Sequence, residues 1–279
     1  MSRVLVVGGD GLIGRDLIPA LRGAGHDAVG TSYRQPLPDG AVNLDLTVPE
    51  PDISDGFDAI VIAAAVVLRQ DCEADPDRAR LVNVDAPLAL AAPVLARGGQ
   101  VIFLSTSIVL GGDRPHLPVD APYAPFDVYS RLKAEAEQRL RTLPGADHGL
   151  AVLRLAKVLD ASYGVIAAWA KAAEDGRPIT PFTDLVTAPM TVGHVVGKIT
   201  AMIDARTTGI HHLSGIEHTY AEIAKRLGAE LGWPDALIQP QEGRQNNPIA
   251  AQNPPHASLE AERPMLLDEV IGALVKQLS

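Results

Sequence analysis

The 279-residue sequence predicts an α/β fold, a doubly wound parallel sheet followed by a smaller C-terminal lobe. Three observations support this prediction. Short β-branched runs alternate with longer amphipathic runs over the first two-thirds of the chain, the first run ends in a glycine-rich turn, and the alternation loosens after Lys157. The length suits one large α/β domain, or a nucleotide-binding domain with a second lobe.

Five runs have the pattern of strands in a parallel sheet. The first, residues 3–7, is a continuous β-branched and leucine run that ends in glycines, which is typical of a strand buried on both faces. The other four cover residues 27–33, 57–65, 99–107 and 149–159, and a further short strand is expected at 209–215.

Helices are predicted between these strands. Apolar residues recur at helical spacing from Leu12 to Leu21, and Gly25 stands where a helix stop belongs. Longer helical runs cover 79–97, interrupted near Pro87, and 126–143. Strands that alternate with helices imply right-handed βαβ units.

The C-terminal part is predicted to be less regular. Thr219 and Glu222 form a capping box for a helix over 220–232, and the last helix begins near Pro264. Residues 177–190 read as irregular structure, and the polar loop 239–256 reads equally well as a functional loop or a surface connector. The predicted domains are a nucleotide-binding domain, residues 1–158 plus 191–216, and a substrate-binding lobe, residues 159–190 and 217–279.

Composition narrows the classes of partner. The net charge of −10 argues against nucleic acid or an anionic membrane surface. The single cysteine, Cys72, excludes an internal disulfide and fits a reducing compartment. The chain shows no signal-peptide pattern, and no run is expected to reach the roughly 18 to 20 apolar residues of a membrane span. We therefore expect a cytoplasmic protein without membrane contact.

The stretch VLVVGGDGLIG, residues 4–14, can be read in two registers. Counting from Gly9 gives G-x-G-x-x-G, and counting from Gly8 gives G-x-x-G-x-x-G. Either pattern lets backbone N–H groups approach a pyrophosphate at a helix N-terminus, because no Cβ atom stands in the way. The buried strand before the turn and the amphipathic helix after it favour nucleotide binding over a purely structural turn.

The end of the second strand bears on the choice of cofactor. Residues 30–34, GTSYR, contain no carboxylate to hold a ribose 2′-hydroxyl. A hydroxyl and a guanidinium, from Ser32 and Arg34, suit a 2′-phosphate instead, so NADP(H) is favoured over NAD(H). The alternative is that Arg34 is a solvated surface charge. Asp45 and Leu46 are placed where an adenine could be contacted.

Tyr129 and Lys133 lie four positions apart in a helical run, so both side chains fall on one helix face. The segment LSTS, residues 104–107, ends the fourth strand, where parallel sheets build their sites. A phenol with a pKa near 10 needs a nearby cation to exchange protons at neutral pH, and Lys133 can supply it. Thr106 or Ser105 can hold a substrate oxygen beside the phenol, which gives a general acid/base arrangement next to a hydride carrier.

These motifs resemble the extended short-chain dehydrogenases/reductases, and among them the dTDP-4-dehydrorhamnose reductase (RmlD-like) branch, over nearly the whole length. The resemblance selects the G-x-x-G-x-x-G register. It matches the segment after the third strand, AAAVVLRQ with Asn83 further on, and it implies Thr106, Tyr129 and Lys133 as the catalytic set. The predicted cofactor-binding residues are Gly8, Gly11, Leu12, Ile13, Gly14, Ser32, Arg34, Asp45, Leu46, Ala63, Ala64, Ala65, Asn83, Tyr129 and Lys133.

The resemblance implies a Rossmann-type fold and an NADP(H)-preferring oxidoreductase. The enzyme would reduce a keto group of a nucleotide-activated sugar, with Tyr129 as general acid/base. A nucleotide sugar is the implied partner, and a homodimer is left open. The chain carries no metal-ligand motif such as H-E-x-x-H or C-x-x-C.

The sequence departs from the branch on the substrate side. Ser107 and Ile108 replace polar groups that would face the sugar, and Lys157 stands where the branch tends to carry an aromatic. The candidate substrate contacts are Ser105, Ser107 and Lys157. An equally good interpretation of Lys157 is that its aliphatic stem packs at the lobe boundary while its ammonium group stays in solvent. One alternative is an epimerase or dehydratase, and Ser107 in place of a carboxylate disfavours the dehydratase. Another is a cofactor-binding regulatory subunit, which the presence of both Tyr129 and Lys133 disfavours.

Overall fold

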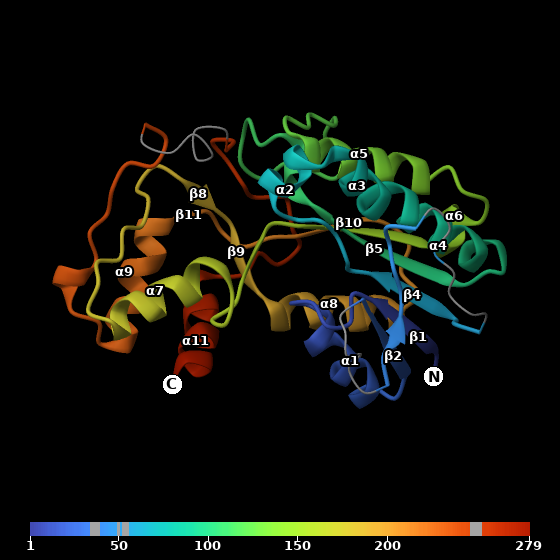
Figure 1. Ribbon diagram of the computed structural model, residues 1–279, viewed down its shortest axis with the longest axis horizontal. Helices are drawn as coiled ribbons and strands as arrows, with labels where there is room; N and C mark the ends of the chain where they lie inside the picture. Colours follow the sequence, from blue (N-terminus) through green and yellow to red (C-terminus); the bar gives the residue numbers. More distant parts are fainter. Residues whose placement is uncertain (34–39, 49–50, 52–55, 246–252) are drawn as a thin grey trace. The chain divides into compact units, whose positions relative to one another are not determined.

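The computed structural model describes residues 1–33, 40–48, 51, 56–245 and 253–279. Within these ranges the main element is a seven-stranded sheet of order β10-β6-β5-β4-β1-β2-β3 (Figure 1). Its strands are β1 Arg3–Val7, β2 Asp27–Ser32, β3 Val42–Asn43, β4 Ala59–Ile62, β5 Gln100–Thr106, β6 Leu150–Leu155 and β10 Gly209–Leu213. Strand β1 pairs in parallel with both β2 and β4, so the strand order reverses there, and this confirms the doubly wound prediction.

The chain divides into two compact units. Unit 1 comprises Met1–Val109, Tyr123–Arg154 and Gly193–His211, and unit 2 comprises Leu110–Pro122, Leu155–Val192 and His212–Ser279. Unit 1 holds the body of the parallel sheet and the glycine turn, and unit 2 holds short strand pairs and three longer helices.

Helices cover both faces of the sheet in unit 1. Figure 1 shows α1 and α8 along one face and α3, α4 and α5 along the other. Their bounds are α1 Gly14–Gly23, α2 Arg69–Ala74, α3 Pro76–Arg80, α4 Ala86–Ala96, α5 Val128–Leu140, α6 Ala146–Gly149 and α8 Val192–Asp204. Strand residues such as Leu5, Ile60 and Phe103 are fully buried against α4 and α5, because a sheet covered on both faces needs apolar side chains on both.

The helical run Pro76–Ala96 corrects one expectation. It has 21 residues and is long and apolar enough to cross a membrane, whereas we expected no such run. In the structure 56% of its apolar window is buried inside the fold, which is typical of the core helix of a globular protein. Its predicted interruption takes the form of a π-helical turn, η1 Leu81–Asp85, just before Pro87.

Unit 2 has its own core. Helices α7 Gly164–Glu174, α9 Tyr220–Leu231 and α11 Leu267–Leu278 bury apolar side chains against one another, among them Trp169, Leu227 and Leu274. The capping box of Thr219 and Glu222 is confirmed at the start of α9. The last helix begins at Leu267 rather than near Pro264. Two 3₁₀ turns, η2 Ser107–Leu110 and η3 Asp235–Leu237, complete the described helical elements.

Two strand predictions differ from the structure. The run 149–159 forms β6 and then β7 Lys157–Leu159, which pairs in parallel with β9 Pro189–Thr191 in a separate sheet. The segment 177–190, predicted to be irregular, contains β8 Val186–Thr187 and the start of β9. Strand β8 pairs with β11 His218–Thr219 in an antiparallel ladder.

Candidate active site

The glycine turn between β1 and α1 is fixed by close backbone packing. Gly8 has φ +87°, a left-handed conformation that favours glycine. A Cβ atom at Gly14 would lie 2.1 Å from the carbonyl oxygen of Gly8, so no larger residue fits there. Gly9 packs against Gly30 of β2, where a Cβ atom would lie 2.6 Å from the Gly30 Cα. Gly9 therefore seats the turn on β2.

The same turn leads directly into the N-terminus of α1. A Cβ atom at Gly11 would meet only the Gly8 carbonyl oxygen, at 3.2 Å. Ile13 occupies the N-cap position of α1, and its apolar side chain makes no capping hydrogen bond. In the first turn of α1 the Arg15 N–H donates to the Gly11 carbonyl and the Asp16 N–H to the Ile13 carbonyl. A glycine-rich turn that leads into a helix N-terminus without a side-chain cap fits the pyrophosphate of a dinucleotide. Leu12 and Ile13 lie half-buried between these glycines.

The end of β2 carries a group that the sequence analysis did not assign. The Ser32 hydroxyl, 2% exposed, donates to the Asp10 carboxylate with Oγ and Oδ2 2.9 Å apart. A cavity of about 120 Å³ opens beside this pair. It is lined by Gly9, Asp10, Ile18, Arg22, Gly30, Thr31, Ser32, Gly40 and Ala41. Arg34 lies outside the described residues.

Asp45, predicted near an adenine, is engaged with its own turn. Its carboxylate accepts from the Thr47 N–H at 2.8 Å and from the Thr47 hydroxyl at 2.6 Å. These hydrogen bonds, with one from Tyr33, lower the pKa of Asp45 below its ordinary value. Leu46 packs against the core of unit 1.

The segment after β4 runs against the glycine turn. The N–H groups of Ala63 and Ala64 both donate to the Val7 carbonyl, and the Cβ of Ala64 lies 3.0 Å from where a Cβ atom at Gly8 would stand. Asn83, 1% exposed, clamps this segment from the π-helical turn. Its amide oxygen accepts from the Val66 N–H at 2.8 Å and its amide nitrogen donates to the Val66 carbonyl at 3.0 Å. Asn83 thus holds the loop that carries Ala63, Ala64 and Ala65.

Helix α5 presents Tyr129 in its first turn and Lys133 in its second. Asp127 caps this helix in a capping box with Ser130, and it forms an ion pair with Arg69. Because the cap fixes the first turn, it also fixes the position of Tyr129.

Burial shifts the pKa values of the Tyr129 and Lys133 side chains in opposite directions, because it disfavours the charged form of each. Burial raises the pKa of the Tyr129 phenol well above its ordinary value, and Cys72 and Asp127 act in the same direction. We expected Lys133 to lower the pKa of Tyr129, whereas burial is the largest influence on that pKa and raises it. Burial also lowers the pKa of Lys133 to about 7, opposed by the charge of Glu137. The Lys133 ammonium lies 3.7 Å from the centroid of the Phe103 ring, a cation–π contact that partly compensates for lost water.

The end of β5 separates the two candidate hydroxyls. Thr106 is half-buried, and its hydroxyl oxygen lies 3.4 Å from the Ile108 N–H. Ser105 is 5% exposed and donates its hydrogen to Glu137, so its hydroxyl is held in the interior. Ser107 is half-buried in η2. Lys157 is exposed on β7 and belongs to unit 2.

Glu137 is the centre of a buried network that the sequence analysis missed. Its carboxylate accepts from Ser105, from the Tyr123 hydroxyl at 2.9 Å, and from the Arg154 guanidinium at 2.8 Å. The side chains of Glu137 and Arg154 are 0% and 1% exposed. A signal was present in the sequence, because Arg154 interrupts the otherwise apolar strand LAVLRL.

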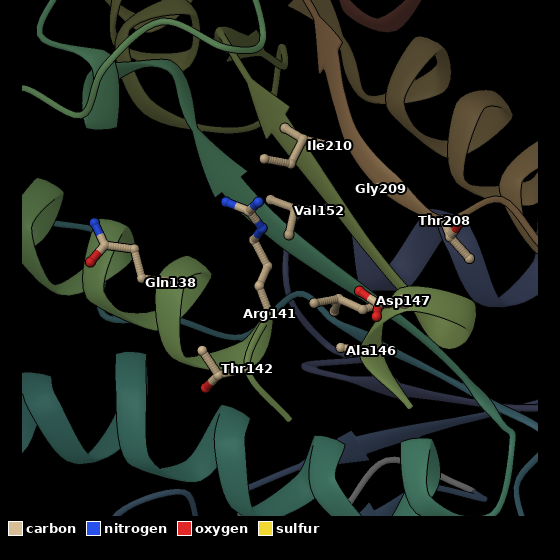
Figure 2. A pocket seen from close by; sticks show the side chains of 10 residues that line it. Gln138, Arg141, Thr142, Ala146, Asp147, Val152, Thr208, Gly209 and Ile210 are labelled. Atoms are coloured by element: carbon tan, nitrogen blue, oxygen red, sulfur yellow. The ribbon is translucent and has the colours of Figure 1, made fainter. Parts of the chain in front are cut away.

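A second cavity of unit 1 lies away from these residues. It measures about 480 Å³ and is bounded by the last turn of α5, by α6, and by the amino ends of β6 and β10. Figure 2 shows Arg141 extended toward Val152 and Ile210, with Asp147 and Thr208 nearby. None of the predicted site residues lines it. The glycine turn follows β1 and Thr106 ends β5, so both lie at carboxyl ends of strands, where ligands bind in open α/β sheets. The candidate catalytic residues Tyr129 and Lys133 are on α5.

Comparison with known sequences identifies the family. Residues 2–269 match the model of the RmlD substrate binding domain. A probable low-salt glycan biosynthesis reductase, Agl14, of Haloferax volcanii is 30% identical over 84% of this chain and 82% of its own. A dTDP-4-dehydrorhamnose reductase of Mycolicibacterium smegmatis is 27% identical over 94% of this chain and 79% of its own. The methionine adenosyltransferase 2 subunit beta of Bos taurus is 26% identical over 94% and 81%.

Solved structures share the fold. The dTDP-4-dehydrorhamnose reductase of Yersinia enterocolitica has a TM-score of 0.84 at 19% identity, with both chains covered fully. The enzyme of the same name from Bacillus anthracis, in complex with NADP, has a TM-score of 0.84 at 18% identity and the same coverage. The Bordetella bronchiseptica enzyme WbmG, in complex with NAD and UDP, has a TM-score of 0.78 at 19% identity over 99% of this chain and 93% of its own. The chain therefore belongs to the RmlD substrate binding domain family, as an RmlD-like extended short-chain dehydrogenase/reductase.

Proposed function

We propose that the protein is a reductase that uses NADP(H) in preference to NAD(H) and reduces a keto group of a nucleotide-activated sugar, as a dTDP-4-dehydrorhamnose reductase does. The observation that carries this proposal is the placement of Thr106 at the end of β5 and of Tyr129 and Lys133 on α5, which packs against β5. The names of relatives support the substrate class: besides the reductase of M. smegmatis, a probable dTDP-4,6-dihydroxy-2-methyloxan-3-one 4-ketoreductase of Streptomyces antibioticus is 28% identical over 86% of this chain.

Each residue of this set has a distinct role. A bound nicotinamide cofactor supplies the hydride. Thr106 orients the substrate oxygen with its hydroxyl, and Tyr129 donates the proton to that oxygen. Lys133, with its pKa of about 7, can hold or release a proton near neutral pH. It serves as the charge that stabilises Tyr129 once the phenol has lost its proton.

Reduction needs Tyr129 as a proton donor, and burial, which raises the pKa of its phenol, favours the protonated form that a donor needs. The names of the relatives, rather than this pKa, favour reduction over the alternatives within the superfamily. An epimerase or dehydratase begins with oxidation of the substrate, which needs Tyr129 as a base. A dTDP-glucose 4,6-dehydratase of Streptomyces venezuelae shares the fold with a TM-score of 0.77, but at 19% identity that likeness concerns the fold alone.

The proposed cofactor preference rests on the residue types at positions 32 and 34, because the hydroxyl of Ser32 and the guanidinium of Arg34 are donors that suit a 2′-phosphate. The turn of Gly8, Gly11 and Gly14 would hold the pyrophosphate. We further propose that residues 159–190 and 217–279 form the substrate-binding lobe, and that Ser107 and Lys157 contact the nucleotide sugar.

A second candidate function is a cofactor-binding regulatory subunit. The observation that favours it is the relationship to methionine adenosyltransferase 2 subunit beta, which is named as a subunit of another enzyme and aligns with 94% of this chain. Such a role would need cofactor binding without turnover.

The test combines binding and turnover. We expect NADPH and NADH to raise the melting temperature, because each binds only the folded state, and NADPH to raise it more at equal concentration. Oxidation of NADPH is then followed with a panel of nucleotide-activated keto-sugars. Tyr129→Phe should lower kcat/KM by about 10²- to 10⁴-fold, because the proton donor is lost.

Tyr163→Phe is the matched control. It removes the same phenolic hydroxyl from a tyrosine that is 54% exposed, so kcat/KM should stay at the wild-type value. Equal rates for the wild type and Tyr129→Phe would remove Tyr129 from the mechanism. Cofactor binding without turnover of any keto-sugar would favour the regulatory subunit.

A further inference from the structure

The end of β2 has no carboxylate of its own, but the glycine turn supplies one. Asp10 follows Gly9, whose N–H donates to the Thr31 carbonyl at 2.8 Å. The Gly8 N–H donates to the Thr31 hydroxyl at 3.1 Å. These bonds fasten the turn to the last residues of β2, and the Asp10 carboxylate receives the Ser32 hydroxyl at 2.9 Å. The turn thus brings an acid into contact with Ser32, the last residue of β2, and the end of this strand is where the usual fingerprint has its acid.

The cavity of about 120 Å³ beside Asp10 and Ser32 has one acidic and one basic residue in its lining. The acid is Asp10. The base is Arg22 at the end of α1, whose Nε donates to the Ala28 carbonyl at 3.0 Å. A ligand that enters this cavity therefore meets the carboxylate of Asp10 as well as the guanidinium of Arg22.

We infer that Asp10 is the residue that sets the selectivity between NAD(H) and NADP(H). Its carboxylate accepts a hydrogen bond from a ribose hydroxyl, and it opposes a 2′-phosphate by charge repulsion. The inference rests on the proposed function only in requiring that a nicotinamide dinucleotide binds at the glycine turn.

Hydrogen-bond accounting leads to the same conclusion. An ionised carboxylate is an acceptor only, and so is a phosphate, whereas a ribose hydroxyl can donate. Ser32 has a single hydroxyl hydrogen, which in this structure is given to Asp10. A 2′-phosphate must therefore take that hydrogen away from Asp10 and also lie close to a like charge, while a 2′-hydroxyl disturbs neither. Asp10 thus limits the preference for NADP(H) that Ser32 and Arg34 would otherwise give, and NAD(H) is accepted as well.

The test measures dissociation constants by isothermal titration calorimetry for four ligands: NADPH, NADH, adenosine 2′,5′-bisphosphate and 5′-ADP. The last two lack nicotinamide and report on the adenosine end alone. In Asp10→Asn, NADPH and the 2′,5′-bisphosphate should bind about tenfold more tightly, because one close like-charge contact is gone. NADH and 5′-ADP should bind with equal or lower affinity, because a ribose acceptor has become weaker.

The control is Asp16→Asn, which removes the same charge in the first turn of α1, where Asp16 is half exposed beside Arg15. It should change all four ligands by a similar factor. Asp10→Ser serves as a second variant if Asp10→Asn does not fold, and it should tighten the 2′-phosphate ligands in the same way.

An equal change for all four ligands in Asp10→Asn, or no change, would overturn the inference. Failure of all four to bind the wild type would overturn it together with the proposed function. A selective gain for the 2′-phosphate ligands without turnover of any keto-sugar would support the role of Asp10 and count against the reductase.

Discussion

Two strand ends of unit 1 are built alike and differ in what surrounds them. At the end of β2 the Ser32 hydroxyl donates to Asp10, and at the end of β5 the Ser105 hydroxyl donates to Glu137. Glu137 is completely buried and paired with Arg154, whereas Asp10 is half-buried and lines a cavity. The same serine–carboxylate contact is therefore part of a buried, stabilising network at the end of β5 and lies beside a cavity at the end of β2.

The difference shows that the role of a carboxylate follows from its remaining partners. Glu137 also receives Tyr123 and the guanidinium of Arg154, so its charge and its lone pairs are satisfied inside the protein. If Glu137 lost its charge, the Arg154 guanidinium would stay in the protein interior with neither a counter-charge nor water around it, which is strongly destabilising. Asp10, in contrast, lines a cavity. We expect mutations at Glu137 to change stability and mutations at Asp10 to change binding.

The largest expected effect is that of Glu137→Gln. The substitution keeps the shape but leaves the Arg154 guanidinium buried without a counter-charge, which should cost about 3–5 kcal/mol of unfolding free energy. For a chain of this size the melting temperature should fall by about 10 °C. Differential scanning calorimetry measures it.

The control for this change is Asp175→Asn. Asp175 pairs with Lys171 at 2.9 Å on the exposed surface of α7, so its removal should leave the melting temperature unchanged within error. If Glu137→Gln melts with the wild type, the network at the end of β5 is not the stabilising network that the comparison assumes.

A pH-dependent effect of intermediate size is expected at Lys133, one helical turn before Glu137. Its pKa is about 7 in the folded protein and close to 10.5 when unfolded, so between these values only the unfolded chain holds the proton. Stability from this group should rise with pH over that window, by at most about 1.4 kcal/mol per pH unit. Lys133→Met removes this titrating amine and with it this pH-dependent contribution to the free energy of unfolding.

The measurement is the difference in unfolding free energy between the wild type and Lys133→Met from pH 6 to pH 10, which spans roughly the window given by linkage. The wild type should gain on the variant as the pH rises, and the variant should be the more stable protein in acid. A difference that stays constant with pH would mean that Lys133 is solvated like a surface lysine.

The smallest expected effect on stability is that of Asp10→Asn. The amide can still accept the Ser32 hydrogen, and the site faces a cavity, so the ligand-free unfolding free energy should change by less than about 1 kcal/mol. Thermal melts without ligand check this. If Asp10→Asn were as damaging as Glu137→Gln, the two strand ends would be structurally equivalent and the comparison would fail.

Local patterns made much of the fold predictable from sequence. Strand β1 was predicted with its observed bounds, because a β-branched run that ends in glycines depends on neighbours in the chain alone. The same is true of the glycine turn and of the capping box at Thr219. The helical spacing of Tyr129 and Lys133 likewise placed both on α5.

Features that depend on distant partners were not predictable in this way. The run 149–159 splits because the Ala156 N–H still bonds to Leu213, whereas the Lys157 N–H bonds to Ala188 and begins a second sheet. Periodicity does not encode that change of partner. The pairs of Asp10 with Ser32 and of Glu137 with Arg154 likewise join residues that meet only after the sheet has formed.

The contact between Gly9 and Gly30 has a consequence for protein engineering. The two backbones touch here with no room for a side chain. A methyl group at Gly30 would lie 2.5 Å from the Ile18 side chain, and a methyl group at Gly9 would lie 2.6 Å from the Gly30 Cα. The methyl group at Gly9 would push the turn away from β2 and separate Asp10 from Ser32. At Gly30 the end of the Ile18 side chain can move aside, but the Gly9 Cα, 3.1 Å away, must still shift by a few tenths of an ångström. To change the coenzyme preference, Asp10 and Ser32 are therefore the positions to vary. Gly9 and Gly30 should be kept, because their contact holds the Asp10 carboxylate beside the Ser32 hydroxyl.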